Sequence, residues 1–152
     1  MTDEMFTPAD VHLDVALDET TKECAIKTAS SFCTGSGVSV EGLSEAFFKR
    51  EAEYSTGCGG GVAIPHAKIA GEVVPKVVVV RFAEPVEWDA IDGEPVRIAF
   101  CLVMPEVDDG NTHLKVVSKL ARKLMVKEFV DNVLSIEDAD ELYGYVVENL
   151  EG

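Results

Sequence analysis

Two apolar runs in the middle of the chain constrain its fold more than any other feature. Residues 77–82 read VVVVRF and residues 96–104 read VRIAFCLVM, so apolar side chains stand at nearly every position of both runs. Successive side chains of a β-strand point to opposite faces of its sheet. Strands of this composition are therefore buried on both faces, and their sheet needs a cover on each side.

The segments around these two runs supply that cover. Residues 11–17 predict a short strand, and residues 20–33 predict a helix that ends at the glycines of the next segment. Ser39 is a suitable N-cap for a second helix that runs to about Ala52. Further helices are predicted over residues 113–126 and 137–150. Helices, strands and helices in this order predict a single α/β domain over residues 1–152, with helices packed on the faces of a sheet.

Composition limits the classes of function. Of the 152 residues, 47% are hydrophobic, which is enough for one core. The 13 basic and 28 acidic residues give a net charge of −15, so the chain lacks the positive charge that binds nucleic acid or acidic lipids. Four scattered cysteines without metal-ligand spacing indicate a reduced, cytoplasmic protein. Acidic residues near the start and the lack of a long apolar run predict neither a signal peptide nor membrane insertion.

One histidine, His66, stands in an unusual place, directly behind an apolar run and a proline. Proline holds the preceding residue extended and has no N–H of its own, so we expect the strand to end at Pro65. His66 would then emerge at the carboxyl end of a strand, where ligands bind in open α/β sheets. The segment before it, residues 55–61, contains four glycines and is expected to be a flexible loop without regular structure.

Two other side chains and this loop can join His66 in a site for a phosphoryl group. Arg50 lies at the edge of the buried face of its predicted helix, and His113 lies at the start of a helix, whose N-terminus attracts anions. Imidazole is a suitable nucleophile near neutral pH, and a guanidinium binds phosphate oxygens. Hydroxyl and backbone N–H groups of residues 55–57 would add neutral donors.

Other interpretations of the same residues stay open on this reasoning. Taken singly, each histidine can be a capping or surface residue, and Arg50 can lie along apolar surface with its charge in water. A metal site is less favoured, because His66 has no ligand partner at the usual spacings. A nucleophile pair of Cys58 and His66 is also less favoured, because a glycine-rich loop holds a thiol poorly. No cofactor is expected.

Three motifs together resemble enzyme IIA of the fructose/mannitol type, from the phosphoenolpyruvate-dependent sugar phosphotransferase system. They are Arg50-Glu51, STG at residues 55–57 and GVAIPH at residues 61–66, in that order and spacing. The resemblance continues through WDAIDGEPV at residues 88–96 and His113-Leu114, and it covers nearly the whole chain. It implies an α/β sandwich in which helices flank a mixed β-sheet on both faces. Ala67 and Cys58 depart from residues common in the family, but neither removes a group that phosphoryl transfer needs.

The resemblance also implies roles for individual residues. His66 matches the family's phosphorylated histidine, Arg50 matches the arginine near the phosphate, and His113 matches the second histidine of the active centre. Contacts to the phosphate are inferred for the matching loop. Its residues are Ser55, Thr56 and Gly57.

A phosphocarrier of this kind has one partner that donates the phosphoryl group and another that accepts it. The resemblance implies that it accepts the phosphoryl group from the histidine-containing phosphocarrier protein and passes it to a cysteine in the IIB domain of a membrane sugar permease, for fructose-type uptake. The family's nitrogen-related branch has the same motifs. A regulatory protein that signals by its phosphorylation state is therefore the alternative.

Overall fold

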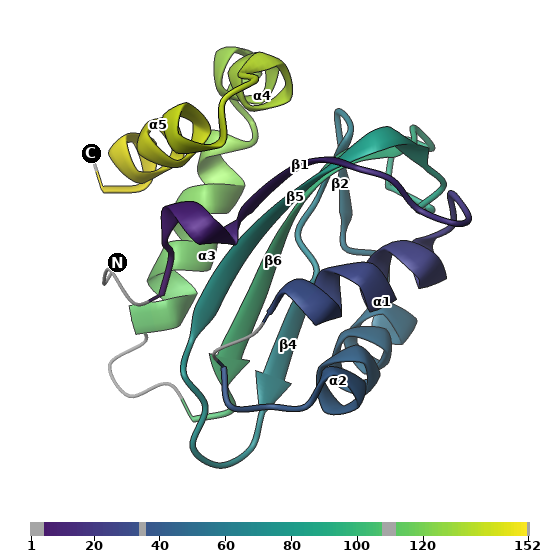
Figure 1. Ribbon diagram of the computed structural model, residues 1–152, viewed down its shortest axis with the longest axis vertical. Coiled ribbons are helices and arrows are strands. Elements are labelled where there is room, and N and C mark those ends of the chain that lie inside the picture. The colour runs from purple at the N-terminus through teal and green to yellow at the C-terminus, as the bar shows by residue number, and fades with distance from the viewer. Residues whose placement is uncertain (1–4, 34–35, 108–111, 152) are drawn as a thin grey trace.

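The computed structural model describes residues 5–33, 36–107 and 112–151, of which residues 112–114 and 151 are described in their backbone alone. A central sheet lies between two groups of helices (Figure 1). In chain order the elements are the 3-10 turn η1 (Pro8–Asp10), β1 (Val11–Val15), α1 (Lys22–Phe32), α2 (Val40–Glu53), β2 (Gly57–Gly59), β3 (Val62–Ala63), β4 (His66–Ile69), β5 (Lys76–Val86), β6 (Val96–Pro105), α3 (Thr112–Lys123), α4 (Lys127–Ser135) and α5 (Ala139–Glu151).

The two apolar runs form the centre of a mixed, six-stranded sheet. β5 and β6 lie side by side and antiparallel, with Val79 opposite Phe100. β1 pairs with β5 in parallel, and β3 and β4 both pair in parallel with the other side of β6. β2 is antiparallel to β3 and ends the sheet.

Alternate side chains of the two central strands enter two separate hydrophobic cores. Val79 and Phe100 belong to the core that α3, α4 and α5 cover. Val80 and Cys101 belong to the core that α1 and α2 cover. All four side chains are fully buried, and burial of a side chain such as valine or phenylalanine contributes about 1.5–3 kcal/mol. The predicted sandwich, with helices on both faces of a mixed sheet, is confirmed (Figure 1).

The helix that packs against β4, α2, begins at a side-chain cap. The hydroxyl of Ser39 accepts a hydrogen bond from the N–H of Gly42 at 3.1 Å, which confirms the predicted start of α2. Such a cap satisfies one of the backbone donors that the first turn of a helix leaves unpaired. α2 then buries Leu43 and Phe47 against the sheet. Arg50, three residues further, lies at the edge of that buried face.

The sequence predicts a strand end at Pro65, and this prediction is confirmed only in part, because β3 ends at Ala63 but β4 begins directly after the proline. β3 and β4 pair with β6 in one continuous register, with Val62 opposite Ile98 and His66 opposite Leu102. Pro65 lacks the N–H for one ladder bond, but its carbonyl oxygen accepts from Leu102 at 2.9 Å. Pairing therefore resumes directly after the proline. His66 follows the end of β3, but it is the first residue of β4 and pairs with Leu102, so it lies within the sheet and not at its carboxyl edge.

The expectation of a loop without regular structure at residues 55–61 is also wrong. Gly57–Gly59 form β2, and Gly59, Gly60 and Gly61 make the turn to β3 with φ values of 90°, 66° and 85°. Residues with a Cβ rarely adopt such angles. Gly57 has a different reason for being glycine, because a Cβ there would lie 2.7 Å from Cβ of Ala90. Close packing and turn geometry, and not flexibility, account for these glycines.

The C-terminal part has one helix more than the sequence predicts. The helix predicted over residues 113–126 is α3, which ends at Lys123, whereas α4 (Lys127–Ser135) lies in a stretch for which the sequence predicts no element. Neither glycine nor proline stands at the break. A turn makes it instead, in which the N–H of Met125 donates to the carbonyl oxygen of Arg122 at 3.2 Å. α4 then adds Phe129 to the core.

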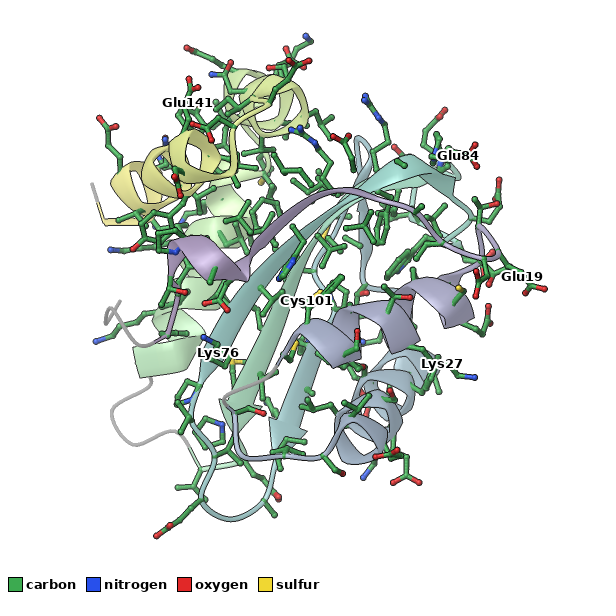
Figure 2. All side chains as sticks on the ribbon, in the orientation of Figure 1. Glu19, Lys27, Lys76, Glu84, Cys101 and Glu141 are labelled. Atoms are coloured by element: carbon green, nitrogen blue, oxygen red, sulfur yellow. The ribbon has the colours of Figure 1, made fainter. Side chains whose placement is uncertain are left out.

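Charged side chains cover the outside of the molecule. Figure 2 shows Glu19, Glu84 and Glu141 extending outward from three separate parts of the chain, and all three are exposed. Lys76 is an exception, because it is buried and its Nζ lies 2.8 Å from Oδ2 of Asp10. In the ranges that the structure describes, every helix is too short or too polar to cross a membrane.

Candidate active site

His66 is half-buried at the start of β4, and both nitrogens of its imidazole have partners. Nδ1 lies 3.0 Å from the carbonyl oxygen of Ile64, and Nε2 lies 2.8 Å from Nε of Arg50. A guanidinium N–H can only donate, so Nε2 is the acceptor of that bond. The proton of the neutral ring is therefore on Nδ1, which donates to Ile64. The lone pair of Nε2 points toward the arginine.

The surroundings favour the neutral form of this imidazole. Burial is the largest cause that lowers the pKa of His66 below its ordinary value. The hydrogen bond to Ile64 and the charge of Glu51 oppose the shift, whereas the positive charges of Arg50 and Lys68 add to it. An imidazolium has no free lone pair, so a lowered pKa keeps His66 nucleophilic to more acidic pH.

Arg50 is held from the other side by Tyr54. Its NH1 donates to the carbonyl oxygen of Tyr54 at 2.9 Å, and its Cζ lies 4.1 Å from the centre of the Tyr54 ring. The hydrogen bond and the cation–π contact together restrict the planar guanidinium. Tyr54 itself is 69% exposed, so the ring lies over the arginine at the surface of the protein.

His66 and Arg50 line an open cleft of about 450 Å³. α2 also contributes Ala46, Lys49 and Glu53, its C-cap contributes Tyr54, and the sheet side contributes Lys68 and Glu106. The lining thus holds three cations and two carboxylates, a positive excess in a chain of net charge −15. Among the described residues, neither Lys49 nor Lys68 has an ion-pair partner. Both ammonium groups are therefore available to an anion in the cleft.

The predicted phosphate-binding loop makes its described contacts elsewhere. Thr56 donates from its hydroxyl to Oε2 of Glu51 at 2.6 Å and from its N–H to Oε1 at 3.0 Å. The hydroxyl of Ser55 donates to the carbonyl oxygen of Trp88 at 3.2 Å and accepts from the N–H of Gly57 at 3.1 Å. None of the three loop residues lines the cleft. Contacts from this loop to a phosphate stay a prediction.

The second histidine of the predicted site, His113, lies in the first turn of α3. Its side chain is outside the part of the chain that the structure describes. The role of His113 beside His66 therefore stays a prediction.

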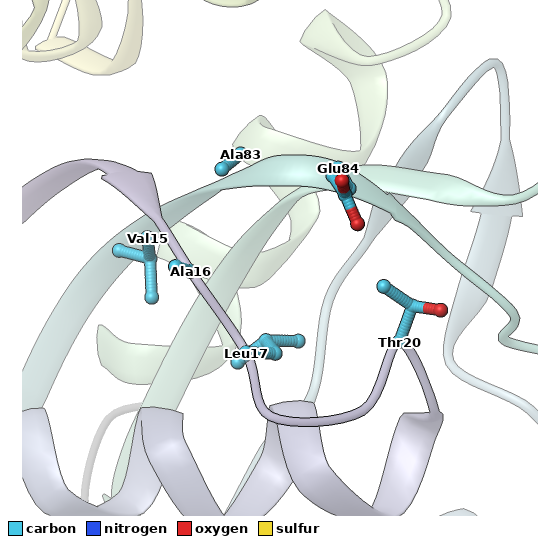
Figure 3. A pocket seen from close by; sticks show the side chains of 6 residues that line it. All are labelled: Val15, Ala16, Leu17, Thr20, Ala83 and Glu84. Atoms are coloured by element: carbon cyan, nitrogen blue, oxygen red, sulfur yellow. The ribbon is translucent and has the colours of Figure 1, made fainter.

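A second cavity lies between the end of β1 and the outer part of β5 (Figure 3). It measures about 190 Å³, and Val15, Ala16, Leu17, Thr20, Ala83 and Glu84 line it. It contains neither a cation nor an imidazole, so it offers no phosphoryl chemistry. In the described ranges, no three His, Cys, Asp or Glu side chains come together as metal ligands.

With this geometry established, comparison with known proteins is decisive. Residues 4–149 match the family model described as "Phosphoenolpyruvate-dependent sugar phosphotransferase system, EIIA 2". The chain belongs to this EIIA type 2 family. The family resemblance of the sequence motifs is thereby confirmed, and a phosphotransfer component of that system is the activity class that the family supports.

Relatives of this EIIA protein carry two kinds of name. A nitrogen regulatory protein from Klebsiella oxytoca is 36% identical over 113 residues, which are 74% of this chain and 69% of that protein. A PTS system fructose-specific EIIA component from Haloferax volcanii is 34% identical over 107 residues, 70% of this chain and 69% of that protein. A PTS system fructose-specific EIIABC component from Bacillus subtilis is 37% identical over 98 residues, 64% of this chain but only 15% of that longer protein.

Solved structures share the EIIA fold. Nitrogen regulatory protein IIA-Ntr from Neisseria meningitidis superposes with a TM-score of 0.87 at 34% identity, over 94% of this chain and 97% of that one. Enzyme IIAMTL from Escherichia coli, in its complex with phosphorylated enzyme IIBMTL, superposes with a TM-score of 0.74 at 21% identity, over 95% and 99% of the two chains. The second likeness concerns the fold alone.

Sequence reasoning missed several groups of the EIIA cleft. Lys68 lies two residues after His66 on one strand, so the two side chains share a face, and this spacing could have identified it. Tyr54 is the C-cap of α2 and has an extended backbone, so helical spacing from Arg50 could not have placed its ring. Glu106 carries no comparable signal. It reaches the cleft because β6 runs beside β4, with Pro105 opposite Ile69.

Proposed function

We propose that this EIIA protein is a phosphocarrier whose phosphoryl group forms on Nε2 of His66. The observation that carries the proposal is the pair of contacts on the imidazole. Nδ1 holds the proton against Ile64, and Nε2 presents its lone pair to Arg50 in a cleft with two further cations. A neutral nucleophile beside preorganised positive charge is what phosphoryl transfer requires of a protein.

The transfer makes one bond and breaks one. Nε2 of His66 attacks the phosphorus of a phosphohistidine on the donor protein, and the P–N bond of the donor breaks with its electron pair returning to the donor's imidazole. The proton on Nδ1 stays where it is and continues to donate to Ile64, which stabilises the positive charge that the ring gains. Arg50 loses its acceptor when Nε2 binds phosphorus, and its N–H groups then bind the phosphoryl oxygens.

The donor in this proposal is the histidine-containing phosphocarrier protein, and the acceptor is a cysteine of a IIB domain of a membrane sugar permease. Two comparisons support this sequence of partners. The relative from Haloferax volcanii is named a fructose-specific EIIA component, and the E. coli relative of the same fold was solved with a phosphorylated IIB enzyme. We propose fructose-type uptake accordingly, with the protein in the cytoplasm.

The second candidate function is regulation by phosphorylation state. It is supported by the nitrogen regulatory protein IIA-Ntr, which has the higher TM-score of the two structures compared above and 34% identity. The same His66 chemistry serves both functions. They differ in the fate of the phosphoryl group, because a transport component passes it to a IIB domain, and a regulator does not need to do so.

Intact mass spectrometry tests the proposal. Incubation with the phosphorylated histidine phosphocarrier protein should add one phosphoryl group to the wild type and to His12→Gln, and none to His66→Ala. His12 is a suitable control because its ring is stacked on Phe32, with ring centres 4.0 Å apart, and it does not line the cleft. Equal phosphorylation of wild type and His66→Ala would end the assignment. Transfer onward to a purified IIB domain then separates uptake from regulation.

A further inference from the structure

A buried carboxylate next to Arg50 has no place in the transfer described above. Glu51 is 7% exposed and belongs to the same helix, α2. Its Oε1 accepts from the N–H of Thr56 at 3.0 Å and from Nε1 of Trp88 at 3.1 Å, and its Oε2 accepts from the Thr56 hydroxyl at 2.6 Å. Nζ of Lys22, on α1, lies 3.6 Å from Oε1.

The bonds of Glu51 continue to His66 through the backbone. The carbonyl oxygen of Thr56 accepts from the N–H of Ile64 at 3.0 Å. The carbonyl oxygen of Ile64 in turn accepts from Nδ1 of His66 at 3.0 Å. Glu51 holds Thr56 by two hydrogen bonds. Two further hydrogen bonds, through Ile64, connect Thr56 to the proton on Nδ1 of His66, which sets the tautomer of the imidazole.

The same carboxylate also fixes the helix that carries the arginine. Successive residues of an α-helix point about 100° apart, so when Glu51 is anchored in the interior, Arg50 is directed to one side of α2. That side faces β4, which lies next to α2 (Figure 1). From that side Nε of Arg50 donates its hydrogen bond to Nε2 of His66 at 2.8 Å. The positions of His66 and Arg50 therefore both depend on the buried carboxylate of Glu51.

We propose that Glu51 is a positioning residue, which holds Nε2 of His66 and the guanidinium of Arg50 in the arrangement that phosphoryl transfer needs. The proposal rests on the proposed function of His66 and extends it to a residue that touches no phosphate. A buried carboxylate is expensive to keep, since an apolar side chain of similar size packs without a desolvation cost. Three hydrogen-bond donors and the ammonium group of Lys22 offset that cost at Glu51.

Glu51→Gln is the direct test, because glutamine keeps the shape and one acceptor but loses the charge and the second carboxylate acceptor. The first readout is the imidazole itself, observed by NMR in protein labelled with ¹⁵N-histidine. Wild type should show one neutral tautomer of His66, with the proton on Nδ1. Glu51→Gln should show a mixture of the two tautomers. Single-turnover phosphorylation of this variant should slow roughly 10- to 100-fold, while the donor concentration that gives half the maximal rate stays unchanged. Glu45→Gln, an exposed carboxylate of α2, should match the wild type.

A second pair of variants tests the same link if Glu51→Gln fails to fold. Thr56→Val removes the hydroxyl donor to Glu51 and should shift the tautomer of His66 as Glu51→Gln does. Thr56→Ser keeps both the hydroxyl and the N–H donor, so His66 should keep the wild-type tautomer. The proposal is overturned if folded Glu51→Gln or Thr56→Val has the wild-type tautomer and transfer rate. The tautomer can be measured without any donor, so an absence of phosphorylation in the wild type would end the proposed function while the NMR result still decides the role of Glu51.

Discussion

Arg50→Lys separates the geometry of the arginine from its charge. Lysine keeps the positive charge, but it lacks the planar fork whose Nε lies 2.8 Å from Nε2 of His66 and whose NH1 lies 2.9 Å from the carbonyl oxygen of Tyr54. A hydrogen bond to a charged group contributes about 1.5–3 kcal/mol, and about 1.4 kcal/mol corresponds to a tenfold change in rate. If one such bond moves from Nε2 to the phosphoryl group in the transition state, its loss slows transfer roughly 10- to 150-fold.

The assay is single-turnover phosphorylation by the phosphorylated donor protein, stopped at intervals and read by intact mass. Arg122→Lys, the same change at an exposed position of α3, should leave the rate unchanged. Thermal unfolding should show that both variants are folded. Arg50→Lys alters one cation–π contact and two hydrogen bonds of a half-buried side chain, so its free energy of unfolding should fall by about 1–3 kcal/mol. A transfer rate for Arg50→Lys within about twofold of the wild type would refute the assignment, since an effect that small lies far below the loss of a charged hydrogen bond.

Three other predictions concern the stability of the fold, the pH dependence of the transfer and the association with the donor protein. Gly57→Ala should lower the free energy of unfolding by about 1–3 kcal/mol, because the new Cβ would lie 2.7 Å from Cβ of Ala90; calorimetry should show a lower Tm, partly restored by adding Ala90→Gly. The rate of phosphoryl acceptance should fall as pH decreases through a midpoint below 6.5, because the folded protein lowers the pKa of His66 and only the neutral ring reacts. Lys68→Gln should raise that midpoint, since it removes a cause of the lowered pKa, and a midpoint at or above 6.5 in the wild type would contradict the account. Association with the upstream carrier should slow with added salt, because a protein of net charge −15 is approached through basic residues of its partner, and stopped-flow rates independent of ionic strength would count against this.

The fold was predictable where short segments carry the whole signal. The apolar runs at residues 77–82 and 96–104 had to be strands buried on both faces, and they are β5 and β6. Ser39 had to cap a helix, and it caps α2. In both cases the deciding interactions lie within one turn or one strand, so a pattern of neighbours was enough.

The predictions failed where a distant backbone decides the outcome. Pro65 does remove one ladder donor, as expected, but β6 lies beside it and pairs with the residues before and after it. Gly57–Gly59 have little tendency to form a strand alone, yet β3 on one side and Ala90 on the other hold them in one. α4 is a different case, because it was missed although Phe129 and Val133, four residues apart and both buried, follow the helical spacing.

The candidate site was predictable only where strand and helix patterns place a residue. His66 and Arg50 are 16 residues apart, and reasoning from strand and helix patterns placed both near one phosphoryl site, where the structure joins them by a hydrogen bond. The hydroxyls of the Ser55–Gly57 loop were expected to face the same site, but their described partners are Glu51 and Trp88. A buried acceptor that satisfies three donors at once arises only from the tertiary fold, so local sequence patterns could not identify it.

The most direct test of the account is the atom that carries the phosphoryl group. In the phosphorylated protein labelled with ¹⁵N-histidine, NMR should detect scalar coupling between phosphorus and Nε2 of His66, while Nδ1 keeps its proton. Coupling to Nδ1, or to a nitrogen of another histidine, would contradict the arrangement in which Ile64 holds one nitrogen of the ring and Arg50 faces the other.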